Sequence, residues 1–416
     1  MEQESAYLLV DKINKWFISD GFNITEPNNM QNDIITILND SGFEIIRSHI
    51  FLNTLHPQVG FEVFRWYKKN MYTEVGVKSE IKETRFFNYD EGNIENVKVS
   101  HLLKNYDIFK NSPLYDVLQT NKKYRYIFKK NETSFKYSIL KDFYNFGATD
   151  YLIMPLDYSF YNKYGVVTWV TNKKEGFSED DLFVLDELSK TLSIYLRSYL
   201  EKQLTKILLS TYLGESTGKK VLNGQITRGN IEKIEAAVWF SDLRNFTSLS
   251  NKYDTGILIE WLNEYFDLIS ISISENNGEI LKFIGDAVLA IFPVSEKNTK
   301  ESSCQDALKA AVLANKKLEE LNILKREKNQ PELMHGIGLH FGLVEYGNIG
   351  ASERLDFTVI GPTVNLASRI ESLCSKLGKK TLISETFSSL CNSKSELVGE
   401  YELKGFKEIQ KIFTPY

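Results

Sequence analysis

The chain has 416 residues and a formal net charge of −5 without a long basic block, so neither nucleic acid nor an anionic membrane is an expected partner. The length suggests roughly two or three domains. No apolar stretch reaches the roughly 18 residues of a membrane span, and the acidic, polar N-terminus lacks the pattern of a secretory signal. Three scattered cysteines without a CxxC pair fit free thiols in a reducing compartment, so we expect a cytoplasmic protein.

The first 177 residues or so are rich in aromatic residues and lysine, and their patterning is irregular. Two runs of β-branched and aromatic residues, each bounded by turn residues, predict strands at Tyr151–Leu156 and Val166–Val170. The five histidines of the chain form no HExxH or similar cluster, so we expect them to be structural rather than metal ligands.

A long helix is predicted to begin at Ser178, a suitable N-cap, with Asp181 in the first turn where the helix dipole favours negative charge. Apolar residues then recur at spacings of three and four, and Gly214 is a suitable end; they are Leu182, Leu185, Leu188, Leu192, Leu196, Tyr199, Leu204, Ile207 and Leu208. The helix either packs on its own domain or forms a parallel dimer helix that joins a sensor to an effector. The heptad spacing is only partly kept, which leaves both interpretations open.

The segment Gly214–Lys220 has a faint likeness to a phosphate-binding loop. Only three residues separate its glycines, where the Walker pattern has four, and a second lysine stands where that pattern requires Ser or Thr. We therefore interpret the segment as a linker turn.

From Ile231 onward, the pattern alternates between strand and helix. Buried-type runs predict strands, and apolar residues at helical spacing predict helices between them. In chain order, the strands are Ala236–Phe240, Glu279–Phe283, Ala287–Phe292, Ile337–Val344 and Asp356–Ile360, and the helices are Ile257–Ile269, Asp306–Leu321 and Val364–Leu373. The order β-α-β-β-α-β, with further elements after it, is that of the ferredoxin-like unit, so we expect an α+β fold for residues 231–416.

Two acidic residues end neighbouring strands of this predicted sheet. Asp242 follows the strand Ala236–Phe240, and Asp286 lies in the tight turn of the next hairpin. If both carboxylates meet at one sheet edge, a cation must relieve their repulsion, and Mg²⁺ takes one or two carboxylates together with phosphate oxygens. Taken singly, Asp242 could instead be a helix cap and Asp286 an ordinary turn residue.

Three segments decide between these alternatives. Together, and in this order, they resemble the catalytic motifs of class III adenylate and guanylate cyclases: Phe240–Thr247 (FSDLRNFT), Lys282–Ala287 (KFIGDA) and Val364–Arg369 (VNLASR). The resemblance runs from about Leu208 to the C-terminus, close to half the chain. Each motif is moderately specific, and the ordered set is strong.

The resemblance implies a role for seven residues. Asp242 and Asp286 resemble the two metal-binding aspartates of the family, which use two Mg²⁺ or Mn²⁺ ions per active site. Asn365 resembles the residue that orients the ribose, and Arg369 resembles the one that stabilises the transition state. Three further residues would bind the substrate. Lys282 and Thr358 would bind the purine, and Lys404 would bind the phosphates.

Elementary chemistry agrees with these residue types. Attack of the ribose 3′-hydroxyl on the α-phosphorus depends on positioning and on stabilising charge over the phosphorus oxygens, for which the planar guanidinium of Arg369 is suited. Adenine presents an amino donor and a ring-nitrogen acceptor. The Thr358 hydroxyl can accept from the amino group, and the Lys282 ammonium can donate to the ring nitrogen. Many family members carry Asp at the position of Thr358, and Thr is the other variant of adenylate cyclases. We therefore expect ATP as the substrate. Bicarbonate sensitivity is suggested only by analogy with that subgroup.

Family members share each site between two chains, with metal residues from one and Asn and Arg from the other. A single catalytic unit that carries every residue type therefore implies a homodimer with two sites at the subunit interface. Two rival functions stay open, a guanylate cyclase and a catalytically silent dimeric sensor module.

The front half resembles a GAF-type sensor domain over a narrower stretch, Gly165–Val170 and Gly176–Leu182 with the following helix. Such domains often bind small molecules or pigments, and the lack of cysteine in this half excludes a thioether-linked bilin. Leu55–Pro57 and Gly147–Asp150 are candidate pocket residues for an unknown small-molecule ligand, with a turn and a strand start as the alternative. The expected domains are a GAF-like α/β sensor at 1–195, a transducing helix and linker at 196–230, and a cyclase catalytic domain at 231–416.

Overall fold

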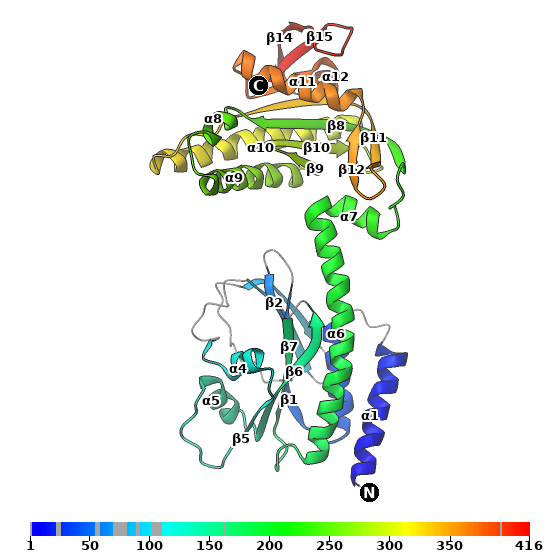
Figure 1. Cartoon of the computed structure of the whole chain (residues 1–416), viewed down its shortest axis with the longest axis vertical. Coiled ribbons are helices and arrows are strands. Elements are labelled where there is room, and N and C mark those ends of the chain that lie inside the picture. The colour runs from blue at the N-terminus through cyan, green and yellow to red at the C-terminus, as the bar shows by residue number, and fades with distance from the viewer. Residues whose placement is uncertain are drawn as a thin grey trace. The chain divides into compact units, whose positions relative to one another are not determined.

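The computed structural model describes residues 2–21, 26–54, 59–69, 81–88, 92–100, 110–160, 163–391 and 393–416. The chain divides into two compact units, Met1–Ile207 and Leu208–Tyr416 (Figure 1). Among the described helices, none combines the length and the apolar character that crossing a bilayer requires.

The first unit is built on a seven-stranded antiparallel sheet in the order β3-β4-β2-β1-β7-β6-β5. Its strands are β1 (Ile45–Asn53), β2 (Val59–Lys68), β3 (Ile81–Asn88), β4 (Gly92–Ser100), β5 (Tyr124–Ile127), β6 (Asp150–Phe160) and β7 (Lys163–Thr171). Its helices are α1 (Glu2–Ser19), α2 (Pro27–Asp40), α4 (Pro113–Thr120), α5 (Ser138–Asn145) and α6 (Glu179–Leu213). The two strands predicted from the sequence are confirmed as the cores of β6 and β7.

The two faces of this sheet bury separate apolar cores because successive side chains of a strand point to opposite faces. On β1, Ile50 and Leu52 pack with α1, α2 and α6, whereas Phe51 packs on the side of α4 and α5. Figure 1 shows α1 and α6 on one side of the sheet and α4 and α5 on the other. The sheet is therefore the middle layer of the unit.

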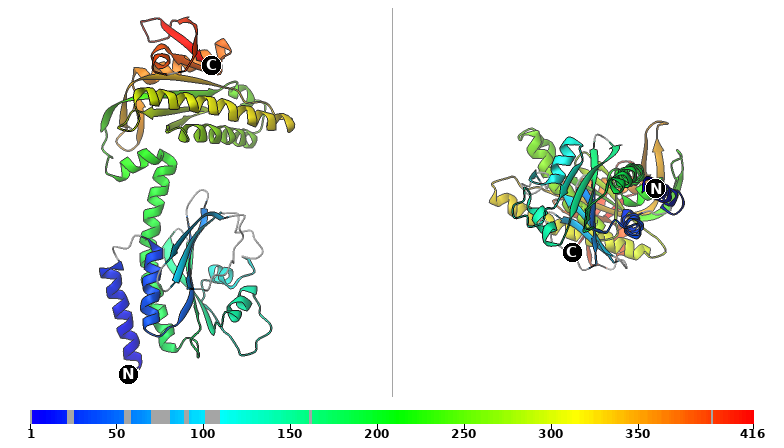
Figure 2. Two further views of the ribbon diagram at one scale, coloured as in Figure 1. Left: turned by 180° about the vertical axis from the view of Figure 1, so that it is seen from behind. Right: turned by 90° about the horizontal axis from the view of Figure 1, so that it is seen from below.

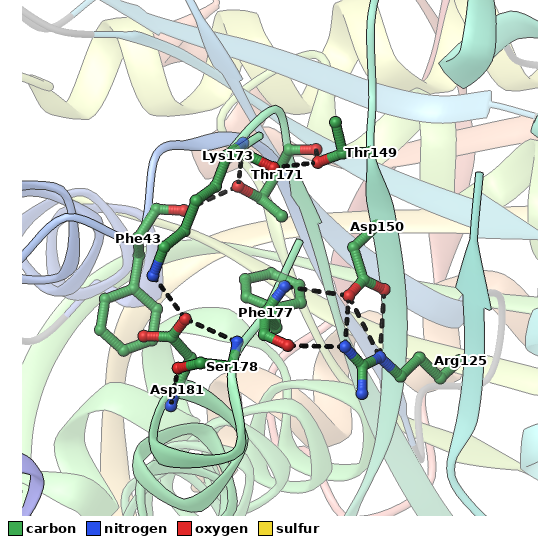
Figure 3. Close-up of polar contacts among 9 residues, drawn as sticks. All are labelled: Phe43, Arg125, Thr149, Asp150, Thr171, Lys173, Phe177, Ser178 and Asp181. Atoms are coloured by element: carbon green, nitrogen blue, oxygen red, sulfur yellow. Dashed lines mark hydrogen bonds and ion pairs between the residues drawn. The ribbon is translucent and has the colours of Figure 1, made fainter. Parts of the chain in front are cut away.

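Helix α6 begins with reciprocal capping. The Asp181 N–H donates to the Ser178 hydroxyl at 3.1 Å, and the Ser178 N–H donates to the Asp181 carboxylate at 2.9 Å (Figure 3), which satisfies two of the free amides at the helix start. Gly214, with φ +85°, follows the last helical residue, Leu213. The start and the end predicted for this helix are confirmed.

The second unit contains an eight-stranded sheet in the order β14-β15-β13-β11-β8-β10-β9, with β12 paired to β11. Its strands are β8 (Ile231–Leu243), β9 (Glu279–Ile284), β10 (Ala287–Pro293), β11 (His335–Gly350), β12 (Leu355–Ile360), β13 (Thr381–Ser384), β14 (Ser395–Tyr401) and β15 (Gln410–Pro415). Its helices after α6 are α7 (Glu215–Leu222), α8 (Phe246–Ser250), α9 (Thr255–Ser274), α10 (Lys300–Glu327), α11 (Pro362–Leu377) and α12 (Glu385–Leu390).

The predicted β-α-β-β-α-β order is confirmed by β8, α9, β9, β10, α10 and β11. In the sheet, β8 lies between β11 and β10, and β9 follows β10, which is the strand order of the ferredoxin-like unit. Helices α9, α10 and α12 share one apolar core with the sheet, whereas α7 and α11 supply residues to a core on the other face. Figure 2 shows the long helix α10, in yellow, running along the sheet.

The interpretation of Gly214–Lys220 as a linker turn is wrong, because this segment forms most of helix α7. Thr217 is fully buried, and its backbone N–H and its hydroxyl both donate to the Glu279 carboxylate, at 3.1 and 3.0 Å. A Cβ on Gly218 would lie 3.0 Å from the carbonyl carbon of Leu209, so glycine allows α7 to pack against the end of α6. The contact with Glu279 comes from a residue far away in the chain, which local turn signals do not reveal.

Candidate active site

Strand register brings the two predicted metal aspartates together. Strand β8 pairs antiparallel with β10, with Ser241 opposite Val288. Asp242 is the next residue along β8, and Asp286 lies in the two-residue turn between β9 and β10. Gly285, the first residue of this turn, has φ +65°, a backbone conformation that glycine adopts without strain. The carboxylates of Asp242 and Asp286 therefore meet at one edge of the sheet.

Where the two carboxylates meet, the pKa of Asp242 is raised, and one of its oxygens has no hydrogen bond among the described residues. Burial raises the pKa of Asp242 to about 6, and the charge of Asp286 and a hydrogen bond to it add to this rise. The Asp242 Oδ1 atom is buried and has no hydrogen-bond partner among the described residues. A buried, unpartnered carboxylate oxygen beside a second carboxylate is the arrangement that a divalent cation satisfies.

A third acidic residue, Glu371 on α11, faces this pair and was not predicted from the sequence. Gly336 on β11 pairs with Asp242, and a Cβ on Gly336 would lie 2.4 Å from Glu371 Oε1. Burial raises the pKa of Glu371 to about 7; the charge of Asp242 adds to the rise, and Arg244 opposes it. Glu371 lies two residues after Arg369 and is buried beside Ile370, a placement that the local sequence pattern does not reveal.

Arg244 follows two residues after Asp242 and was also missed as a functional candidate. Its guanidinium donates to the Lys379 carbonyl, and its buried Nε has no partner in the described part of the chain. No group of three or more His, Cys, Asp or Glu side chains is arranged to hold a metal among the residues that the structure describes. The aspartate pair would therefore need phosphate or water oxygens to complete the ligand shell of Mg²⁺.

Lys282 on β9 forms an ion pair with Asp356 on β12, with 2.8 Å between Nζ and Oδ2. The Lys282 ammonium lowers the pKa of the Asp356 carboxyl through a hydrogen bond. Thr358, two residues along β12, is buried and lies on the same side of the strand as Asp356. The structure thus brings together the strands that carry Lys282 and Thr358, the two residues predicted to bind the purine. It also gives Lys282 an acidic partner, Asp356, that was not predicted from the sequence.

Asn365 and Arg369 lie four residues apart on α11, and both are exposed. Within the described residues, no hydrogen bond or ion pair joins either side chain to the aspartate pair. The face of α11 that reaches the aspartates carries Glu371 instead. A single chain therefore does not unite the two halves of the predicted site.

Lys404 lies in the connection between β14 and β15 and is exposed. Its neighbour Leu403 is buried in a core that includes Leu366 and Ile370 of α11. Packing of Leu403 thus fixes the backbone beside Lys404, and the ammonium remains free to extend into solvent.

In the first unit, the structure favours the structural interpretation of Gly147–Asp150. Gly147 has φ +78° in a turn, and Asp150 begins β6. The fully buried Asp150 carboxylate accepts from Arg125 at 2.7 Å and from the Phe177 N–H at 3.0 Å (Figure 3). The other candidate segment, Leu55–Pro57, lies outside the described residues.

With this geometry in place, comparisons with known proteins identify the second unit. Residues 230–414 match the family model of the adenylate and guanylate cyclase catalytic domain. Adenylate cyclase 1 of Rhizobium meliloti is 33% identical over 175 residues, 41% of this chain and 26% of that protein. The adenylate cyclase of Anabaena cylindrica is 37% identical over 153 residues, 36% of this chain and 29% of that protein. The chain thus spans less than a third of the length of either relative.

Among solved structures, the adenylyl cyclase CyaB from P. aeruginosa is 29% identical, with a TM-score of 0.42 over 45% of this chain and 96% of that chain. The guanylyl cyclase Cya2 is 28% identical, with a TM-score of 0.40 over 45% of this chain and 94% of that chain. The match of residues 230–414 to the family model shows that the second unit contains a class III adenylate/guanylate cyclase catalytic domain.

Proposed function

We propose that the protein is an adenylate cyclase that converts ATP into 3′,5′-cyclic AMP and pyrophosphate. The observation that carries this proposal is the meeting of Asp242 and Asp286 at one sheet edge, with a buried carboxylate oxygen that has no partner among the described residues. The match of residues 230–414 to the cyclase family supports it.

In the proposed reaction, the ribose 3′-oxygen forms a bond to the α-phosphorus, and the bond from that phosphorus to the oxygen bridging the β-phosphate breaks. The hydroxyl proton is lost, and pyrophosphate leaves. Two Mg²⁺ or Mn²⁺ ions, held by Asp242 and Asp286, would supply charge neutralisation on the triphosphate and acidify the hydroxyl. Asn365 would orient the ribose, and Arg369 would stabilise negative charge on the phosphorus oxygens with its planar donors.

The preference for ATP would come from Lys282 and Thr358. The ammonium has three donors, so it can keep its ion pair with Asp356 while it donates to the adenine ring nitrogen. The Thr358 hydroxyl would accept from the adenine amino group, and Lys404 would bind the phosphates as a mobile point charge. Guanine carries a carbonyl in place of the amino group and would lose the threonine contact.

The proposal includes a homodimer with two sites at the subunit interface. Asn365 and Arg369 are exposed, and α11 faces the aspartates of its own chain with Glu371. A second copy of the chain would complete each site, because its Asn365 and Arg369 would face the aspartates of the first copy.

The first unit is proposed to be a GAF-like sensor that regulates the cyclase through α6, in a cytoplasmic protein. The long helix and the mixed sheet-and-helix architecture support this assignment. Comparing full-length protein with a version that starts near Leu204 would test it, because regulation by the first unit predicts different rates for the two.

The test of the enzyme is cyclic nucleotide production from ATP and from GTP with Mg²⁺ or Mn²⁺. We expect cyclic AMP from wild type and a loss of at least about 100-fold in Asp242→Ala, the scale of a lost electrostatic contribution. A preference for GTP would instead identify a guanylate cyclase. Failure of the dimeric wild type to turn over either nucleotide with both metals would leave a silent sensor module.

Mixing inactive variants tests the shared site. Asp242→Ala and Arg369→Ala chains, mixed in equal amounts, should recover about a quarter of wild-type activity, because half of the dimers are mixed and each has one intact site. Absence of recovery, with mixed dimers demonstrated, would place both groups in a site within one chain.

A further inference from the structure

A buried arginine in the first unit has no countercharge among the described residues. Arg47 on β1 is 8% exposed, and its Nη1 has no hydrogen-bond partner within the described part of the chain. Its Nε donates to His49 Nε2 at 3.0 Å. Burial lowers the pKa of Arg47, and the charge of Arg65 adds to this, whereas Tyr67, in part through a hydrogen bond, and Tyr151 oppose it. A buried cation without an anion is costly, so its retention calls for a partner.

The sheet places Arg47 on the face that α4 and α5 cover. Arg47 pairs with Val170 on β7 and with Tyr67 on β2, and Val170 belongs to the core shared with α5. Its guanidinium lies 4.6 Å from the ring centre of Phe143 and 5.4 Å from that of Tyr67. These rings stabilise the cation through their faces, and a hydrogen bond to the Tyr67 side chain favours its charged form, whereas Nη1 is left without a hydrogen-bond partner among the described residues.

Solvent reaches this face beside the buried guanidinium. His49 and Arg65 lie opposite one another in the β1–β2 ladder, and both are partly exposed. The pKa of His49 lies well below its ordinary value, because of burial and of the charges of Arg47 and Arg65, so the ring is neutral. Since His49 Nε2 accepts from Arg47, Nδ1 carries the remaining proton and is a second donor.

We propose that Arg47 and His49 form a binding site for a small organic anion with a planar carboxylate next to an aromatic or other flat group. The carboxylate would accept from Arg47 Nη1, in the geometry that a guanidinium fork favours, and the flat group would pack among Phe143, Tyr67 and Tyr151. A stacked guanidinium donates in its own plane, which suits a planar carboxylate. Inorganic phosphate, with up to two charges and tetrahedral oxygens, fits one buried cation less well.

The experiment uses the full-length protein in anion-poor buffer and follows its melting temperature with benzoate, acetate, benzamide and inorganic phosphate as probes. We expect a saturable rise of a few degrees with benzoate, a smaller one with acetate at equal concentration, and none with neutral benzamide. A rise with phosphate only, or with benzamide as much as benzoate, would overturn the carboxylate assignment, as would no rise with either carboxylate.

Two variants separate a binding role from a structural one. Arg47→Met should lose the benzoate response and keep or raise the melting temperature without ligand, because an unpaired buried charge is removed. Arg47→Lys should keep the fold and bind benzoate at least several-fold more weakly. Arg197→Met, an exposed arginine of the same unit, is the control and should respond as wild type. A lower melting temperature of Arg47→Met without ligand, together with an unchanged benzoate response, would make Arg47 a structural residue only.

Discussion

The repulsion between the two aspartates predicts that removing one charge stabilises the metal-free protein. The perturbation is Asp286→Asn, which keeps the size and the turn position of the side chain. In the folded state, the pKa of Asp242 rises from its ordinary 3.8 to about 6. At about 1.4 kcal/mol for each pKa unit, this rise corresponds to about 3 kcal/mol against the ionised form.

Only part of this penalty comes from Asp286. Burial is the larger cause and persists in the variant, and Asp242 is partly exposed, so water screens the repulsion. We therefore expect Asp286→Asn to raise the free energy of unfolding by about 1 kcal/mol at pH 8 in EDTA. The same variant should lose cyclase activity and most of the stabilisation that Mg²⁺ gives to wild type.

The pH dependence follows from the direction of the shifts. A carboxyl whose pKa is higher in the folded state holds its proton more tightly there, so its contribution to stability is complete below about pH 4 and is lost as the pH rises. The pKa values of about 6 for Asp242 and about 7 for Glu371 place this loss between pH 4 and 7 in metal-free protein. Asp286→Asn should make the loss smaller.

The assay is urea unfolding of the full chain, followed by tryptophan fluorescence, in EDTA and in excess Mg²⁺. Asp267→Asn, an exposed carboxylate on α9, is the control and should behave as wild type. The reasoning is refuted if Asp286→Asn unfolds at lower urea than wild type in EDTA, or if Mg²⁺ stabilises the variant as much as wild type.

Three further substitutions test other contacts. Thr217→Val removes the hydroxyl bond from α7 to Glu279 and should cost about 1–2 kcal/mol of unfolding free energy in urea; an unchanged midpoint would show that the bond adds nothing. Arg125→Met leaves the buried Asp150 carboxylate without its cation and should cost about 3–5 kcal/mol, measured by calorimetry; a loss under 1 kcal/mol would contradict this. Asp356→Asn frees the lysine with which it pairs on β9, and should raise KM for ATP several-fold at nearly constant kcat and stability; a lower KM would mean that the carboxylate competes with adenine.

Much of this fold could be predicted from the sequence because the responsible signals are local. The capping pair at Ser178 and Asp181 marks the start of α6, and the two residues between Ile284 and Ala287 leave room only for a tight turn. Placing Asp242 and Asp286 at one sheet edge needed only strand order, since both residues stand at the ends of predicted strands.

Tertiary structure alone decided the neighbours of these charged side chains. Glu371 faces the aspartates because α11 packs over a glycine of β11, and Asp356 meets Lys282 because β12 reaches β9. Arg47 is buried beside rings that come from β2 and α5. Charge pairing depends on distances between atoms that are far apart in the chain, and packing sets those distances, whereas propensity and periodicity are properties of neighbouring residues.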